Sequence, residues 1–199
     1  TKRMKVIDMM MKSHIIISKS LLENTDSNKQ FFLDSKNFIY GNIKPDIVSK
    51  YKLKKHYLDE SYDMVRQKIG FLSSLNLDSI DHYYTKASLS QEIGVVCHFL
   101  TDFFCLAHSE RWEFKHSMKI HIQYERNLTK VAKDYKIVND RQQYLDGFDE
   151  FFDKMYSEYK SNGKFEENDL KYSTYVCNTV TNYILESILE NTVRSHTVC

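Results

Sequence analysis

The sequence contains little of what β-structure and its turns require. Its 199 residues include only one proline and five glycines. Because all-β domains use both residue types heavily in their turns, these low counts favour an all-α domain. No apolar run approaches the roughly 20 residues that a membrane-spanning helix needs. The 28 basic and 27 acidic residues nearly cancel, so no strong field draws the chain to nucleic acid or anionic lipid.

Cysteine pairs with the CxxC spacing are absent as well. The four cysteines are Cys97, Cys105, Cys177 and Cys199. Two lie within apolar helical segments, so we expect mostly free, buried thiols rather than a disulfide framework. The N-terminal segment TKRMKVIDMMMKSHIIISK is interrupted by Asp8 and Lys12 and makes a poor signal peptide. The protein is therefore expected to be secreted if a signal was removed from this chain, and cytoplasmic otherwise.

Apolar residues recur at helical spacing along most of the chain. We predict helices at about 4–24, 60–75, 84–106, 113–135, 139–160 and 168–192. The segment FIYGNIKPDI at 38–47 holds the only proline and a glycine, so we predict an ordered loop there. A chain of this length with 42% apolar residues can bury a substantial core. We expect one helical domain over residues 1–199.

The stretch VCHFLTDFFCLAHSERWEFKHSMKIHIQYE, residues 96–125, contains four of the eight histidines. On a helix, His98 shares a face with Asp102, and His121 shares a face with Glu125. One such pair is usually an exposed contact. Two pairs with His108 between them, in strongly apolar surroundings, need a partner, because burying so many polar groups is costly. Histidine nitrogens and carboxylate oxygens are the ligands that Zn²⁺ prefers where no thiolate is used.

The order of these residues resembles that of the zinc-dependent phospholipases C of Gram-positive bacteria. The matching segments are SHIIISKSLLEN with His14, GNIKPD with Asp46, KKHYLDESYD with His56, HFLTDFFCLAH with His98, Asp102 and His108, and HIQYE with His121 and Glu125. The closing VTNYILESILEN is similar to the last helix of that family. The resemblance covers residues 13 to about 190. It differs in DFFCLAH, which lacks the proline often found before the family's histidine, so the helix must break without it.

The resemblance implies a cluster of two or three zinc ions. One zinc would be bound by Asp46, His56, His98 and Asp102. A second would be bound by His108, His121 and Glu125, and a third by His14 and a bridging Asp102. The family completes the third site with the amino and carbonyl groups of the mature N-terminal residue, usually a tryptophan. Here the first residue is Thr1 and the only tryptophan is Trp112, so two or three ions are expected.

The fold that the resemblance implies is one compact multi-helix domain of the zinc-dependent phospholipase C and single-strand nuclease type. Larger lipid-acting toxins of the family carry a C-terminal β-sandwich membrane module, but only about 74 residues follow Glu125 here and all of them are typical of helices and loops, so we expect no such module. The implied activity is a lipid-degrading hydrolase, a phospholipase C that releases diacylglycerol and a phosphorylated head group by attack of a zinc-bound water. Clustered zinc neutralises charge on the phosphodiester. Asp46 is the catalytic candidate, which would orient that water or take its proton.

Two alternatives stay open. The same fold serves zinc-dependent single-strand nucleases and nucleotidases, although a nuclease would want a basic groove. A non-catalytic helical protein that holds zinc for structure is the other alternative. For the preferred interpretation we expect a phospholipid or other phosphodiester substrate, no stable nucleic-acid partner, peripheral membrane contact through loops near the site, and a monomer.

The other histidines make weaker ligand candidates. His82 and His196 are expected to be solvated. His116 is an alternative to His121 but has no acid four residues later. Glu113 and His116 form one ExxH motif, whereas carboxylate-bridged di-iron bundles need two.

Overall fold

The computed structural model describes residues 2–27, 29–48, 56–82, 84–112, 118–137 and 147–197. These residues form helices and connecting loops, with no strand among them, which confirms the all-α prediction. The elements are α1 (Lys2–Asn24), the 3₁₀ helix η1 (Gln30–Phe32), α2 (Ser35–Ile47), α4 (Leu58–Ser73), α5 (Leu77–His82), α6 (Lys86–Phe103), α7 (Leu106–Ser109), α9 (Met118–Asp134), α10 (Phe148–Ser161) and α11 (Glu166–Thr197). Among them, no helix is long and apolar enough to cross a membrane.

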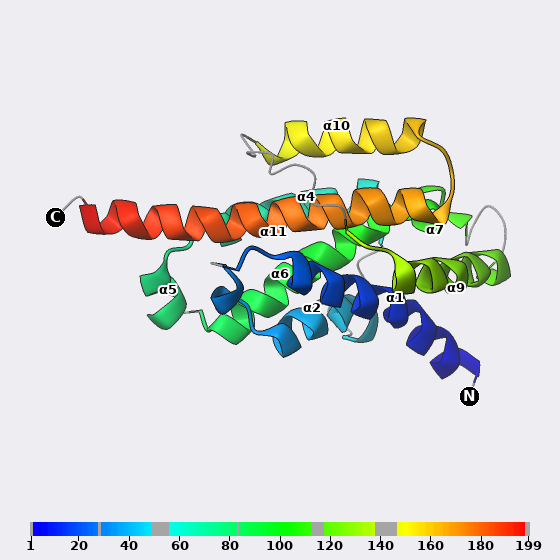
Figure 1. Cartoon of the computed structure of the whole chain (residues 1–199), viewed down its shortest axis with the longest axis horizontal. Helices are drawn as coiled ribbons and strands as arrows, with labels where there is room; N and C mark the ends of the chain where they lie inside the picture. Colours follow the sequence, from blue (N-terminus) through cyan, green and yellow to red (C-terminus); the bar gives the residue numbers. More distant parts are fainter. Residues whose placement is uncertain are drawn as a thin grey trace.

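The longest helix, α11, extends along the molecule, with α10 beside it on one side and α1, α2 and α9 on the other (Figure 1). Helix α6 passes between these groups and contacts α1, α2, α4 and α11. The two ends of the chain lie at opposite ends of the molecule (Figure 1). This arrangement makes α6 the central element, against which α1, α2, α4 and α11 pack.

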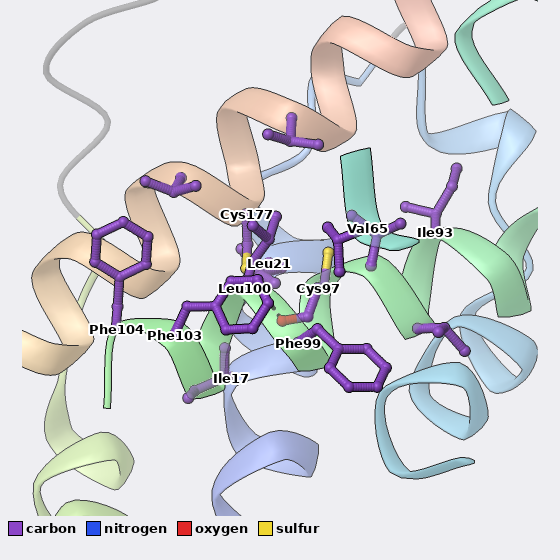
Figure 2. Close-up of a cluster of buried hydrophobic side chains, with 14 of the residues drawn as sticks. Ile17, Leu21, Val65, Ile93, Cys97, Phe99, Leu100, Phe103, Phe104 and Cys177 are labelled. Atoms are coloured by element: carbon purple, nitrogen blue, oxygen red, sulfur yellow. Dashed lines mark hydrogen bonds between the residues drawn. The ribbon is translucent and has the colours of Figure 1, made fainter. Parts of the chain in front are cut away.

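From Ile93 onward, helix α6 is buried on every side. All residues from 93 to 108 are buried, a run that includes most of α6 and the start of α7. A helix that is apolar all round belongs in a core, and Figure 2 shows its aromatic and aliphatic side chains meeting residues of α1, α4 and α11. Cys97, Cys105 and Cys177 are free and buried, as predicted, whereas Cys199 lies outside the described residues. The central helix thus carries His98 and Asp102 into the interior.

Two glycines allow α2 and α6 to pack backbone against backbone. A Cβ atom on Gly41 would lie 2.2 Å from the carbonyl oxygen of Gln91, and one on Gly94 would lie 2.4 Å from that of Phe38. Both distances are far shorter than atoms tolerate, so any larger residue would push the helices apart. This close contact sets the distance between α2 and the histidine that α6 carries.

The predicted loop at 38–47 is wrong, because these residues form most of α2. Asp34 caps the helix by accepting a hydrogen bond from the Asn37 N–H at 2.8 Å. Pro45 lies in the last turn, where it removes only the bond to the Gly41 carbonyl, and the helix ends two residues later at Ile47. Asn42 and Asp46 are therefore about one helical turn apart, so the GNIKPD segment presents both residues on one face of α2.

The other predicted boundaries are close, with one exception. The predicted 84–106 helix is in fact two helices, because Phe104 ends α6 and Cys105 is extended before α7 starts at Leu106. The helix ends here without a proline. Helices α9 and α10 occupy the described parts of the predicted 113–135 and 139–160 helices, whose first segments, 113–117 and 139–146, lie outside the described residues.

Candidate metal centre

The side chain of His98 is fixed by α2. His98 is fully buried, and its Nδ1 lies 2.7 Å from the backbone carbonyl oxygen of Asn42. A carbonyl oxygen only accepts, so Nδ1 carries the hydrogen and donates it. In the neutral ring this leaves Nε2 as the nitrogen with a free lone pair. An imidazole held by its other nitrogen is the usual arrangement around a metal-binding histidine.

Three other side chains converge around that nitrogen. His98 Nε2 lies 3.1 Å from His56 Nδ1 and 3.2 Å from Asp102 Oδ2. His56 Nδ1 lies 2.7 Å from the same oxygen, and Asp46 Oδ1 lies 3.9 Å from both histidine nitrogens. Ligands in tetrahedral zinc sites are separated by roughly 3.3 Å, because each lies about 2.0–2.1 Å from the ion. The group is therefore close to the spacing that a tetrahedral ion requires.

A second group forms between α7 and α9. Glu125 Oε1 lies 3.2 Å from His108 Nε2 and 2.9 Å from His121 Nε2. His121 and Glu125 are four residues apart on α9, and all three side chains are buried. These residues can supply three ligand atoms to one ion.

Asp102 lies between the two groups. Its Oδ2 faces His56 and His98, whereas its Oδ1 lies 3.3 Å from His14 Nε2 and 3.7 Å from His108 Nε2. The His14 ring stacks on the His98 ring with 4.1 Å between centroids. One carboxylate thus faces four histidines with two different oxygens, as a bridging ligand would.

Comparison with known families agrees with this geometry. A family model described as "Zinc dependent phospholipase C" matches residues 13–166, which contain all eight predicted site residues. The chain belongs to the zinc-dependent phospholipase C family. No curated protein and no solved structure gave a significant match.

The residues present in this phospholipase C family member fit zinc. The eight side chains offer nitrogen and oxygen atoms only, a set that zinc accepts. Two carboxylate oxygens, Asp46 Oδ2 and Glu125 Oε2, are buried without a hydrogen-bond partner. Buried anionic oxygens of this kind are costly unless a cation or a donor compensates them. The structure therefore brings all eight predicted residues together, and their individual roles as ligands stay a prediction.

Electrostatic coupling within the metal-free cluster is strong. Burial by itself would raise the pKa of Asp102, but positive charge on His108, His98 and His14 lowers it well below its ordinary value. Burial likewise opposes ionisation of Glu125, yet hydrogen bonds from His108 and His121 lower its pKa to about 2. Burial would lower the pKa of His108, but Asp102 and Glu125 together raise it to about 9. In the absence of metal, the two carboxylates therefore favour a proton on His108.

A cavity of about 540 Å³ opens beside His108. It is lined by residues of α4, α7 and α10 and the segments next to them: Tyr57, Leu58, Asp59, Glu60, Tyr62, Asp63, His108, Ser109, Arg111, Phe152, Asp153 and Tyr156. Arg111, the basic residue of this lining, bonds to Asp59 at 2.5 Å and to Glu60 at 3.3 Å. Its guanidinium also lies 4.4 Å from the centre of the Tyr57 ring. The cavity wall is therefore aromatic and acidic, and its arginine is already engaged.

The remaining histidines lie away from the cluster or outside the described chain. His82 is exposed, and His196 is exposed with its Nε2 3.7 Å from Asp78. His116 and Glu113 lie among residues 113–117, which the structure does not describe. Asn42 was missed by the sequence reasoning, because it contributes a backbone oxygen, which leaves no signal in the residue type.

Proposed function

We propose that the protein is a phospholipase C that hydrolyses a phosphodiester on its glycerol side and holds two or three zinc ions in the cluster. The observation that carries this proposal is the position of Asp102, whose two oxygens face two separate sets of histidines. A structural zinc site needs one closed set of four ligands. A shared carboxylate between two sets is instead typical of clustered ions that act on phosphate esters.

When bound, clustered zinc would supply Lewis acidity to the phosphoryl oxygens and lower the pKa of a coordinated water to about 7. His98 and Asp102, which α6 holds in the core, fix the cluster in place. Asp46 lies at the C-terminal end of α2, and its Oδ2 accepts no hydrogen bond. This oxygen is the group that we assign to orient the attacking water and to accept its proton.

The lining of the cavity supports a lipid rather than a nucleic-acid substrate. Four of its side chains are acidic: Asp59, Glu60, Asp63 and Asp153. Two of them already neutralise Arg111. A polyanion would meet repulsion here, whereas strand-binding proteins offer a positive groove with exposed aromatic rings. A head group without net negative charge meets no such barrier.

The test is a comparison of substrates under identical zinc concentration and pH. We expect the protein to cleave a short-chain phosphatidylcholine faster than single-stranded DNA or a 3′-nucleotide. Activity should disappear with a strong chelator and return when zinc is added, because the metal supplies both the nucleophile and charge stabilisation. Faster turnover of the nucleic acids would assign the protein to the nuclease branch of the fold. No turnover of any substrate would indicate a zinc-binding protein without this chemistry.

A further inference from the structure

A carboxylate outside the cluster connects the elements that carry the group of His108, His121 and Glu125. Asp169, in the first turn of α11, is 2% exposed. Its Oδ2 accepts hydrogen bonds from the Leu106 N–H and from the Tyr124 hydroxyl, both at 2.8 Å. Its Oδ1 accepts one from the Tyr159 hydroxyl at 2.9 Å. One side chain therefore links α7, α9 and α10 to α11, and it lies beyond residue 166, where the family match ends.

The bond to Leu106 determines where α7 begins. Leu106 is the first residue of α7, and the N–H groups at the start of a helix have no acceptor within the helix. Cys105 precedes it in an extended conformation and provides no side-chain cap. A proline at a first helical position would need no acceptor, but leucine does, because this N–H lies in the core. Asp169 supplies that acceptor for Leu106, which precedes His108 by two residues.

The hydrogen bond from Tyr124 fixes the position of α9 relative to α7. Tyr124 is buried, directly precedes Glu125 and follows His121 by three residues. A hydrogen bond from its hydroxyl to Asp169 limits both the rotation of α9 about its axis and its movement along it. The same oxygen, Oδ2, therefore holds the helix of His108 and the helix of His121 and Glu125.

We propose that Asp169 is a positioning residue that holds α7 and α9 together so that His108, His121 and Glu125 meet around one ion. This inference rests on the proposed function, because it assumes that the group binds zinc. The other group is supported differently, by Asn42 of α2, whose carbonyl holds His98. Loss of Asp169 should therefore weaken one zinc site and leave the other unchanged.

The test measures zinc affinity by competition with chelators, independently of hydrolysis. We expect Asp169→Ala to weaken zinc binding at the His108 group about 10- to 100-fold, as loss of outer-shell partners commonly does, so that the titration loses one tight ion per chain. Asp169→Asn should restore most of the affinity, because an amide oxygen can still accept from Leu106 and Tyr124. If negative charge alone mattered, asparagine would be as damaging as alanine.

Two further variants separate positioning from general stability. Tyr124→Phe should weaken the same site, because it removes the α9 bond. Tyr172→Phe removes the hydroxyl of another buried tyrosine of this region, which accepts a hydrogen bond from Asn162, and should leave both sites intact. When His121→Ala has already removed a ligand of this site, adding Asp169→Ala should not weaken zinc binding there any further.

Equal zinc affinity in the wild type, Asp169→Ala and Tyr124→Phe, or equal weakening of both sites, would overturn the inference. If Asp169→Ala does not fold, the zinc affinities of Tyr124→Phe and Asp169→Asn test the inference instead. A wild-type protein that binds no zinc would instead overturn the proposed function.

Discussion

Replacing Asp102 with asparagine is expected to remove more than one zinc ion per chain and to lower phosphodiester hydrolysis by about 1000-fold or more. The factor corresponds to several kcal/mol of lost charge stabilisation. Asparagine keeps one oxygen but replaces the other with an amide NH₂, which donates hydrogen bonds and cannot bind a metal. Whichever way the amide turns, either His56 and His98 or His14 and His108 would face a donor. Elemental analysis and a hydrolysis assay measure both effects.

The matched control for Asp102 is Asp78. It also lies next to a histidine, His196, at 3.7 Å, but both side chains are exposed and neither belongs to the cluster. Asp78→Asn should therefore keep full zinc content and activity. Helical circular dichroism of Asp102→Asn should largely survive, because the core around α6 is mainly apolar. An Asp102→Asn protein with full zinc and full activity would rule out the bridging role.

Removal of zinc is expected to make the stability of the protein fall as pH rises from about 6.5 to 9. In the metal-free chain, Asp102 and Glu125 outweigh the effect of burial and raise the pKa of His108 to about 9. The folded state then binds a proton more tightly than the unfolded state, so this contribution is complete below the ordinary pKa of 6.5 and disappears as pH rises through 9. The shift corresponds to a decrease of up to about 3 kcal/mol in the free energy of unfolding.

The zinc-loaded protein should show the opposite trend. Histidine must lose its proton before it binds a metal, so zinc affinity rises with pH, and a ligand that binds only the folded state stabilises it. Denaturant unfolding measured with zinc and with a chelator gives two free energies of unfolding at each pH. The gap between these two free energies should be wider at pH 9 than at pH 6.5. His196→Ala serves as control, because its exposed ring should leave the gap unchanged. Parallel pH dependence with and without zinc would contradict this account.

The spacings of the candidate ligands were the most predictable part of the molecule. His98 with Asp102 and His121 with Glu125 obey the four-residue repeat of a helix, a local rule that the three-dimensional structure preserves. The same kind of local reasoning was wrong for residues 38–47. Glycine and proline usually indicate a loop, but here Gly41 provides a contact surface for α6 and Pro45 lies near the helix end. The role of Gly41 becomes visible only when the position of the neighbouring helix α6 is known.

Asp169 shows a different limit of sequence reasoning. An acidic residue in the first turn of a helix is usually exposed and interacts with the helix dipole. The packing of α7, α9 and α10 against this turn is what buries Asp169, and burial raises its pKa to about 7 even though Leu106, Tyr124 and Tyr159 donate to it. The cavity beside His108 is equally a product of tertiary packing, since its lining comes from separate parts of the chain. Neither feature has a spacing that could be recognised in the sequence.

The most direct test of the zinc cluster is a crystal structure with anomalous diffraction recorded on both sides of the zinc absorption edge. We expect two or three zinc peaks per chain, each within the buried cluster. One should lie among Asp46, His56, His98 and Asp102, and another among His108, His121 and Glu125. No zinc peak, or a single peak away from Asp102, from protein purified without chelator would contradict the cluster on which the proposed function depends.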